Sequence, residues 1–430
     1  MIDFSIKNLD IFNSMKPRLV FFFFANESPG GIEMLWVRLA KALQQEYDVF
    51  VLDDCKTSIF RKLLKDDKVS FLDFSFKGTT LPDDAVVIAP LNYPNLAGCF
   101  NGKNLRFLFW SLYEKSALCV ETYRWLHLFE NKFQINFSRK TEKLFMKLMN
   151  PVLYKHLRAF YQIANEKQAL IYMAKDNIIF DEDYFDIKLK ENIIPLGLEM
   201  KSPVEFNLNP NYIRACWLGR FVGFKYNAIK NVIVGLHDFC QKYPEITVHL
   251  DLIGYGDFEN QIKQDCLNYT CSNFIPEIKG KMIGDTLQTY LQNNVDLLCA
   301  HGTAILEGAK YGIPSLVFSH GYHFSKVNWL FNFGYGQIGS MVDNSGISVV
   351  DAMNQFLAKN KSIGKKCYEH FCENFTIETC KSLLIKNTQL TQLRVEDLRK
   401  MNLSKHIFWA RMIEWYRNVH FIYKIAGAIE

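Results

Sequence analysis

Two series of short apolar runs, each followed by segments with helical periodicity, constrain most strongly what this chain can fold into. In the first series we expect strands at 18–25, 47–52, 85–89 and 105–110, and a helix at 32–43. In the second series we expect strands at 213–218, 247–253, 274–278, 295–299 and 315–318, and helices at 227–243, 258–269, 285–292 and 304–311. Alternating strands and helices are typical of parallel sheets covered by helices. The sequence therefore predicts two doubly wound, Rossmann-like α/β domains.

The length of the chain supports this division, because 430 residues exceed what one hydrophobic core usually organises. We expect an N-terminal domain over residues 1–205, a second domain over residues 206–400, and a terminal aromatic and basic helix over residues 401–430. The net charge of +5 is small for this length and disfavours a nucleic-acid-binding protein.

The cysteines and the N-terminus favour a cytoplasmic protein. The 11 cysteines are scattered and form no Cys-x-x-Cys pair, so neither a disulfide framework nor a common structural zinc site is indicated. Residues 1–16 lack the apolar core of a signal peptide, and the apolar run 19–24 is too short to cross a bilayer.

A first chemical signal is the pair Gly30 and Gly31, between the first predicted strand and the first predicted helix. Glycines at such a turn let a phosphate approach the backbone, and the N-terminus of the helix favours an anion. An ordinary glycine turn is the alternative. The pair is not the Gly-x-Gly-x-x-Gly fingerprint of dinucleotide enzymes, which disfavours a dehydrogenase.

A second signal follows the strand 213–218, where Gly219 and Arg220 precede Lys225 in what we expect to be a loop. A forked guanidinium and a mobile ammonium group suit a diphosphate, although two solvated loop cations are the alternative. A third signal is the glycine turn at Gly254, after the strand 247–253. The following loop carries Lys281 and Met282, where backbone groups can face a flat base.

The most specific signal is the segment from Ala300 to Pro314, which includes Gly302, Thr303 and Glu307. Gly302 and Thr303 are expected at a helix start, where their amides can donate to a phosphate. Glu307, one turn inward, can accept hydrogen bonds from ribose hydroxyls. The alternative is that Glu307 only complements the helix dipole.

In this order, the signals resemble family 4 and related GT-B glycosyltransferases, and they cover most of residues 18–318. The resemblance implies two Rossmann-like domains facing each other across a cleft, with a nucleotide-diphosphate sugar as donor substrate and no other cofactor. The resemblance also implies roles at the donor diphosphate: Gly30 and Gly31 flank the diphosphate, Arg220 and Lys225 neutralise it, and Gly302 and Thr303 bind it through the backbone. For the nucleoside it implies that Glu307 holds the ribose and that Lys281 and Met282 face the base. Gly219 and Gly254 belong to the glycine turns of the same site.

One departure from the family pattern concerns its paired acids, Glu-x7-Glu. The second acid is Glu307, but the first position is Cys299, which leaves the stereochemical outcome open. His301 lies in the same neighbourhood and is a candidate catalytic residue beside Arg220 and Lys225, with a packed or solvated histidine as the alternative. If the reaction inverts configuration, His301 or Glu114 is the candidate general base.

The expected reaction is transfer of a hexosyl-type sugar to a glycan or lipid-linked acceptor, in bacterial surface polysaccharide synthesis. A metal-independent mechanism is favoured, because no Asp-x-Asp motif stands at a strand end and the pairs at 53–54 and 83–84 fit surface turns. A sugar-nucleotide epimerase of the same fold, or a non-catalytic nucleotide-sugar-binding partner, is the alternative. Turnover with and without an acceptor separates these functions.

The tail from Lys405 to Lys424 is the most aromatic and basic stretch of the chain. By the same resemblance we expect it to cross back and cover the N-terminal domain. The alternative is that it lies on an anionic membrane surface, at the cytoplasmic face of the inner membrane.

Overall fold

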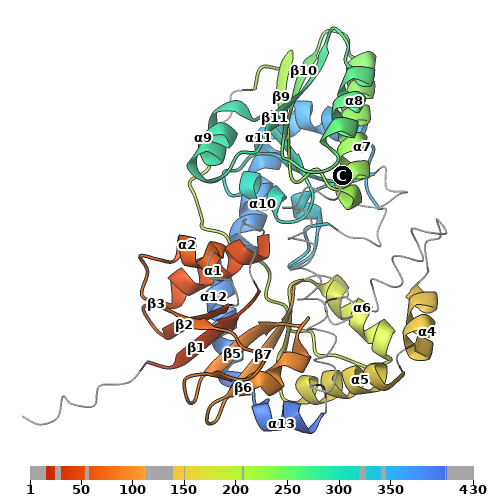
Figure 1. Cartoon of the computed structure of the whole chain (residues 1–430). Coiled ribbons are helices and arrows are strands. Elements are labelled where there is room, and N and C mark those ends of the chain that lie inside the picture. Colours follow the sequence, from red (N-terminus) through yellow and green to blue (C-terminus); the bar gives the residue numbers. More distant parts are fainter. Residues whose placement is uncertain are drawn as a thin grey trace, which may run out of the picture. The chain divides into compact units, whose positions relative to one another are not determined.

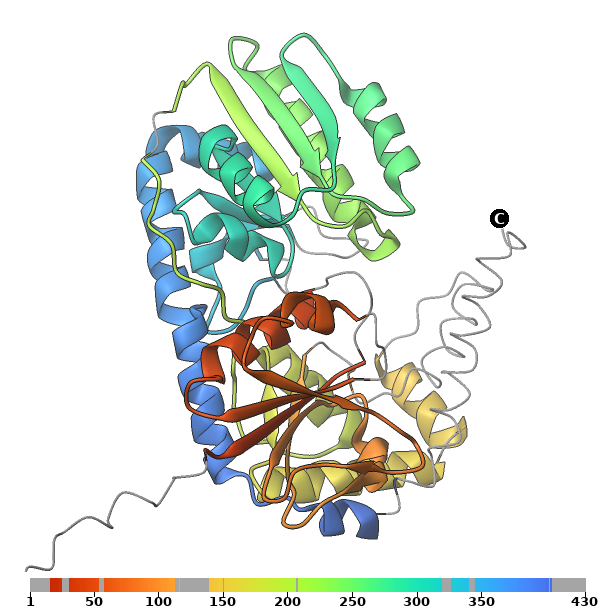
Figure 2. The same cartoon turned by 60° about the vertical axis from the view of Figure 1, so that its left-hand side comes forward.

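The computed structural model contains two compact units, which are described separately. It describes residues 16–24, 31–53, 58–112, 116, 139–149, 151–205, 208–318, 326–339, 345–401 and 403. Unit 1 comprises Met1–Met173, Asn177–Asn192 and Leu383–Glu430, and unit 2 comprises Ala174–Asp176 and Ile193–Ser382. Each unit has its own sheet with helices packed around it (Figures 1 and 2).

The sheet of unit 1 is entirely parallel, with the strand order β3-β2-β1-β5-β7-β8. Its strands are β1 (Arg18–Phe22), β2 (Asp48–Asp53), β3 (Val69–Asp73), β5 (Val86–Pro90), β7 (Arg106–Ser111) and β8 (Leu170–Tyr172). Its helices are α1 (Gly31–Leu43), α2 (Ile59–Leu63), α4 (Arg139–Met149), α5 (Pro151–Glu166), α6 (Lys175–Phe185) and α13 (Val395–Lys400). A short pair, β4 (Thr79–Thr80) and β6 (Phe100–Asn101), and the 3-10 helix η1 (Pro94–Cys99) complete it.

The core of unit 1 follows from apolar strands that are covered on both faces. Every residue of β5 is buried, and so is every residue of β7 after Arg106. Strands in the middle of a parallel sheet are continuously apolar because helices cover both sides. On α1, Leu35, Leu39 and Leu43 recur at a spacing that places them on one buried helix face.

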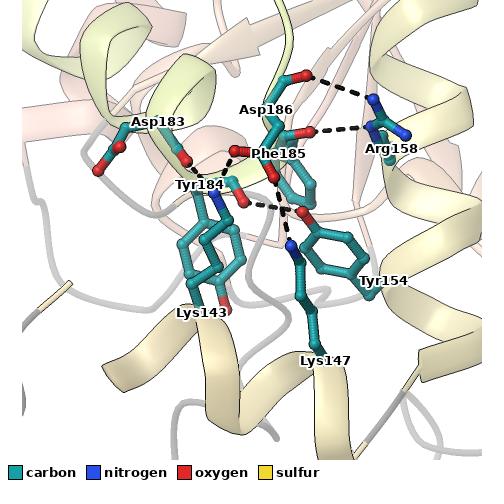
Figure 3. Close-up of polar contacts among 8 residues, drawn as sticks. All are labelled: Lys143, Lys147, Tyr154, Arg158, Asp183, Tyr184, Phe185 and Asp186. Atoms are coloured by element: carbon teal, nitrogen blue, oxygen red, sulfur yellow. Dashed lines mark hydrogen bonds and ion pairs between the residues drawn. The ribbon is translucent and has the colours of Figure 1, made fainter. Parts of the chain in front are cut away.

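Three cations hold the end of α6 in unit 1, as Figure 3 shows. Lys143 and Lys147, both on α4, form ion pairs with the carboxylate of Asp186, and the hydrogen bond from Lys143 lowers the pKa of Asp186. Arg158 on α5 donates to the carbonyl oxygen of Phe185 at 3.0 Å. Cations stabilise this end of a helix because its last carbonyl groups carry partial negative charge. The contacts join α4, α5 and α6.

The sheet of unit 2 has the order β11-β10-β9-β12-β13-β14, and only β14 is antiparallel to its neighbour. Its strands are β9 (Tyr212–Leu218), β10 (Thr247–Ile253), β11 (Phe274–Gly280), β12 (Leu297–Ala300), β13 (Ser315–Phe318) and β14 (Val327–Trp329). Its helices are α7 (Gly223–Lys242), α8 (Glu259–Tyr269), α9 (Gly284–Asn294), α10 (Ala304–Ala309), α11 (Val349–Asn374) and α12 (Ile377–Leu390), with the 3-10 helix η2 (Leu330–Asn332).

Both sheets share one topology, which confirms the predicted fold class of two Rossmann-like domains. Counted along the chain, each sheet has the order 3-2-1-4-5-6 of the doubly wound fold. The order reverses between β1 and β5 in unit 1 and between β9 and β12 in unit 2. In such sheets ligands bind at the carboxyl ends of the strands beside this reversal.

The chain returns to unit 1 through α12, which begins in unit 2 and ends in unit 1. Beyond it, the amide of Phe107 donates to the carbonyl oxygen of Leu393 at 2.8 Å, and Thr391 donates through its hydroxyl to the carbonyl oxygen of Phe107 at 2.6 Å. Arg399 donates to the carbonyl oxygen of Phe100 at 2.9 Å. Residues 391–399 are therefore bonded into unit 1, ahead of the boundary at residue 400 that we expected from the sequence. Residues 404–430 lie outside the described residues.

Two expectations about the surface have different outcomes. Asp53 was expected in a surface turn, but it is the last residue of β2 and is fully buried, because β2 continues through it. Asp83 and Asp84 do lie in a turn, where Asp84 has a positive φ of 59°. No helix within the described ranges is both long and apolar enough to span a membrane.

Candidate functional site at the carboxyl edge of unit 2

The strand pairing of unit 2 gathers most of the predicted donor-site residues at one sheet edge. β9 and β12 are neighbours, and Leu218 pairs with Ala300, so Gly219 and His301 follow directly from paired positions. Ile253 of β10 pairs with Leu218 from the other side. The loops after these three strands therefore emerge together, beside the point where the strand order reverses.

Gly254 is required by a close approach between two of these loops. The amide of Gly219 donates to the carbonyl oxygen of Ile253 at 3.0 Å, and the amide of Gly254 donates to that of Gly280 at 2.9 Å. A Cβ atom on Gly254 would lie 2.0 Å from the carbonyl oxygen of Gly219 and 2.7 Å from a ring carbon of Phe221. Only glycine fits there, so Gly254 shapes the loop, and its predicted contact with a ligand stays a prediction.

Arg220 and Lys225 are two cations in close electrostatic contact. Arg220 is exposed in the loop, whereas Lys225 is half-buried in the first turn of α7, which begins at Gly223. Our expectation that both cations precede the helix is therefore wrong for Lys225, because the helix starts four residues earlier than the apolar periodicity indicated. Burial and the neighbouring Arg220 lower the pKa of Lys225 to about 8. An anion bound beside these groups would relieve both effects.

Trp217 adds a buried donor that the sequence analysis did not single out. A Cβ atom on Gly219 would lie 3.4 Å from the Nζ atom of Lys225 and 3.5 Å from the Nε1 atom of Trp217. The Trp217 side chain is fully buried, and its Nε1 group has no hydrogen-bond partner among the described residues. A buried N–H group without an acceptor is costly, and an indole ring can only donate. No sequence pattern marks this residue.

The loop after β11 contains Lys281 and Met282. Lys281 is exposed, with its Nζ atom 4.7 Å from the centroid of the Tyr255 ring, and Met282 is half-buried. Tyr255 lies in the turn that contains Gly254. The carbonyl oxygen of Tyr255 accepts a hydrogen bond from the amide of Phe221 at 2.8 Å. This loop therefore lies beside the Gly254 turn at the sheet edge. Its contact with a base stays a prediction.

His301 has a defined proton arrangement. Its Nδ1 atom lies 2.9 Å from the carbonyl oxygen of Phe318. Because a carbonyl only accepts, Nδ1 donates the proton of this hydrogen bond. A Cβ atom on Gly339 would meet the His301 ring at 3.3 Å, so the ring is packed on this side. The side chain is half-buried, and its predicted catalytic role stays a prediction.

Gly302 and Thr303 form the turn into α10. Gly302 has a φ of 68°, in the left-handed region that favours glycine, and no atom would lie within 4 Å of a Cβ added to it. Thr303 is the residue before the helix and makes no capping hydrogen bond through its side chain. The open space at Gly302 agrees with a role in which the backbone itself faces a ligand.

Glu307 lies in the first turn of α10, and its carboxylate forms an ion pair with Lys310 three residues later. The Lys310 side chain is only 6% exposed and that of Glu307 is 20% exposed. The ion pair holds the Glu307 carboxylate in place, and its predicted contact with a ribose stays a prediction. The structure thereby adds a partner, Lys310, that the sequence analysis did not predict.

Cys299 stands at the position where the Glu-x7-Glu pattern has its first acid, and this position lies inside strand β12. Cys299 is the third residue of β12 and has no exposed surface, and burial raises the pKa of its thiol. A carboxylate there would be buried inside the sheet. Only His301, Gly302 and Thr303 separate β12 from α10, so this turn has no further residue that can carry an acid.

In unit 1, Gly31 is the first residue of α1, whereas Gly30 and Glu114 lie outside the described residues. Ser111, close to Glu114 in the sequence, is buried at the end of β7 and accepts a hydrogen bond from Asn177 through its carbonyl oxygen at 3.1 Å. Ser111 is therefore part of the packing of unit 1.

Comparison with solved structures identifies the fold. HepE from Anabaena, crystallised with UDP and glucose, has a TM-score of 0.53 at 14% identity, over 87% of this chain and 99% of that one. A glycosyltransferase from Rickettsia africae has a TM-score of 0.55 at 13% identity, over 87% of this chain and 98% of that one. An Escherichia coli trehalose-6-phosphate structure with UDP-2-fluoro glucose has a TM-score of 0.51 at 10% identity, over 86% and 99%.

The chain has the GT-B fold. No protein-family model matches the sequence, and no curated protein matches it either. The GT-B likeness thus rests on backbone structure at very low identity, and it extends over nearly the whole length of each of these proteins. The roles of individual residues have to come from the geometry of unit 2.

Proposed function

We propose that the protein is a glycosyltransferase that binds a nucleotide-diphosphate sugar at the carboxyl edge of the unit 2 sheet. The observation that carries the proposal is the pairing of β9 with β12, which places Arg220, Lys225 and the Gly302 turn at one edge. HepE was crystallised with UDP-glucose, and a donor of that class fits a site of cations and exposed backbone.

In this proposal the diphosphate is the leaving group. The bond between the anomeric carbon and the diphosphate oxygen breaks, and a hydroxyl group of a glycan or lipid-linked acceptor forms the new bond and loses its proton. Arg220 and Lys225 neutralise the charge that develops on the leaving oxygen, which lowers the barrier electrostatically without requiring a metal ion. The backbone at Gly302 supplies further donors.

Two further assignments complete the donor site. Glu307, fixed by Lys310, accepts hydrogen bonds from the ribose hydroxyls, and the loop with Lys281 and Met282 faces the base. His301 is the candidate catalytic residue near the reacting sugar. The physiological setting we propose is synthesis of a bacterial surface polysaccharide.

A non-catalytic donor-binding protein is the second candidate, and the observation that favours it is the buried thiol at Cys299. The two functions differ in turnover, because a transferase releases the nucleotide mainly when an acceptor is present. A sugar-nucleotide epimerase would convert the donor without an acceptor.

Calorimetric titration with a panel of nucleoside diphosphates and sugar nucleotides tests the donor site. We expect one nucleotide to bind selectively, and Arg220→Ala and Glu307→Ala to weaken it by about tenfold to a hundredfold, because each removes a charge-assisted hydrogen bond. Lys365→Ala, which removes an exposed cation on α11, is the matched control and should bind normally. If folded protein binds no nucleotide in the panel, the transferase and the epimerase are both excluded.

A further inference from the structure

A second cluster in unit 2 lies on the face of the sheet, on β10 and β11, and takes no part in the donor site. His249 and Asp251 are two residues apart on β10 and so point to the same side of the sheet. Asp251 is directly paired with Glu277 of β11. Two carboxylates opposite each other on neighbouring strands repel, so this arrangement needs a cation.

The three ligand-type atoms have the spacing of a metal site. The Nε2 atom of His249 lies 3.4 Å from Oδ1 of Asp251 and 3.3 Å from Oε2 of Glu277, and all three atoms lie within 4.8 Å of one another. A tetrahedral zinc ion with bonds of about 2.0–2.1 Å separates its ligand atoms by about 3.3–3.4 Å. The distances from His249 thus already match the edges of such a tetrahedron.

The outer contacts orient these atoms as they do in metal sites. The hydroxyl group of Tyr212 lies 3.3 Å from Nδ1 of His249; when Nδ1 donates to it, the lone pair of the ring is on Nε2. Tyr290 on α9 donates to Oδ2 of Asp251. The other oxygen, Oδ1, faces the cluster, is buried and has no hydrogen-bond donor with good geometry among the described residues. The Asp251 side chain is only 8% exposed.

Lys279 is the competitor of a metal ion in this cluster. Its Nζ atom lies 2.7 Å from Oε2 of Glu277 and 3.5 Å from Oδ1 of Asp251. The ammonium group therefore occupies the cation position between the two carboxylates. Its side chain is 27% exposed, so it can move into solvent when a more highly charged ion enters.

We propose that His249, Asp251 and Glu277 bind a divalent transition-metal ion of the zinc class, which displaces the Lys279 ammonium group and joins β10 to β11. One imidazole nitrogen and two carboxylate oxygens are ligands that suit zinc, and water completes the coordination. The site is independent of the proposed donor site, because none of its residues lies in the loops at the carboxyl edge.

Titration of the full-length protein with zinc alone, in the absence of nucleotide, tests the site. We expect one ion per chain, weaker binding by about tenfold or more in Glu277→Gln, and tighter binding by about fivefold to tenfold in Lys279→Met. Glu277 is exposed, so its amide variant keeps both shape and folding. Because the two variants are expected to change zinc affinity in opposite directions, they distinguish this site from zinc binding to thiols elsewhere in the chain.

The control is His237→Ala, which removes a histidine on α7 that, among the residues described, lies near one carboxylate, that of Asp238, at 3.4 Å. This variant should bind zinc as the wild type does, and His249→Ala should lose the site. Cobalt should report tetrahedral coordination by its visible absorption in the wild type. Equal zinc affinity in the wild type, Glu277→Gln and His249→Ala would overturn the proposal and leave an ion-pair network between the strands.

Discussion

The buried Asp181 in unit 1 and the half-buried Lys225 in unit 2 both have a pKa of about 8, but their surroundings differ. Asp181 accepts a hydrogen bond from Tyr161 at 2.8 Å and is only 2% exposed. Lys225 is half-buried beside a second cation, Arg220. Burial favours the neutral form in both cases. Asp181 has a hydrogen-bond partner inside the fold, whereas Lys225 lies beside a like charge at a sheet edge, where we propose that an anion binds.

The loops at the carboxyl edge of the unit 2 sheet approach each other through their backbones, so a substitution there is expected to have the largest effect on stability. Gly254→Ala should destabilise the protein by on the order of 4 kcal/mol, because its Cβ atom would lie 2.0 Å from the carbonyl oxygen of Gly219. Denaturant unfolding measures the change. Gly302→Ala is the control: it has open space and only an unfavourable φ of 68°, so it should cost about 1 kcal/mol. Equal costs would show that the loops do not approach as closely as described.

The interior of unit 1 predicts a pH effect from Asp181. Burial raises its pKa to about 8, so the folded protein keeps a proton that the unfolded chain releases near pH 4. The stability this proton provides is complete below pH 4 and is lost as the pH rises toward 8. Relative to the wild type, Asp181→Asn should gain on the order of 3 kcal/mol between pH 5 and pH 8.

Unfolding of Asp181→Asn and the wild type at both pH values measures this difference. Glu182→Gln, on the neighbouring residue whose side chain is 22% exposed, is the control and should show a much smaller pH dependence. If Asp181→Asn follows the wild-type pH profile, the carboxyl group is ionised in the folded state and the contrast with Lys225 fails.

The lowered pKa of Lys225 leads us to expect a smaller effect, a pH dependence of nucleotide binding. In the free protein its ammonium group loses its proton near pH 8, so affinity for a nucleoside diphosphate should fall about tenfold from pH 7 to pH 9. Lys225→Met should bind about tenfold more weakly at pH 7 and lose this pH dependence. Lys225→Arg keeps the charge over the whole range and should also be insensitive to pH. Calorimetry at both pH values, with Lys365→Ala as control, gives the comparison.

The expected strands and helices of both series are present, because buried parallel strands are continuous apolar runs that can be recognised locally. The sequence analysis missed three strands of the two main sheets, which are β3 (Val69–Asp73), β8 (Leu170–Tyr172) and the antiparallel β14 (Val327–Trp329). β3 is an edge strand with half-exposed residues, and β14 has only three residues, so neither gives a clear apolar run. β8 lies in the apolar run 169–174, which was not recognised as a strand. The start of α7 was misplaced because Gly223 does not mark a helix interior.

For the donor site, the order of glycines and charges along the chain was sufficient to select Arg220, Lys225, Gly302 and Glu307 as candidates. It did not indicate the buried N–H group of Trp217 or the partner Lys310, because both depend on what lies beside them in space. The same holds for Cys299, whose burial in β12 explains why a carboxylate is absent from that position.

The sequence by itself determined two doubly wound domains and the loops that carry their glycines and cations, because periodicity and turn chemistry are local properties. Only the tertiary structure decided that β9 lies beside β12, that residues 391–399 bond to unit 1, and that His249 and Asp251 meet Glu277. These are contacts between residues far apart along the chain. They form only when strand pairing and burial bring the residues together, and no local pattern encodes that pairing.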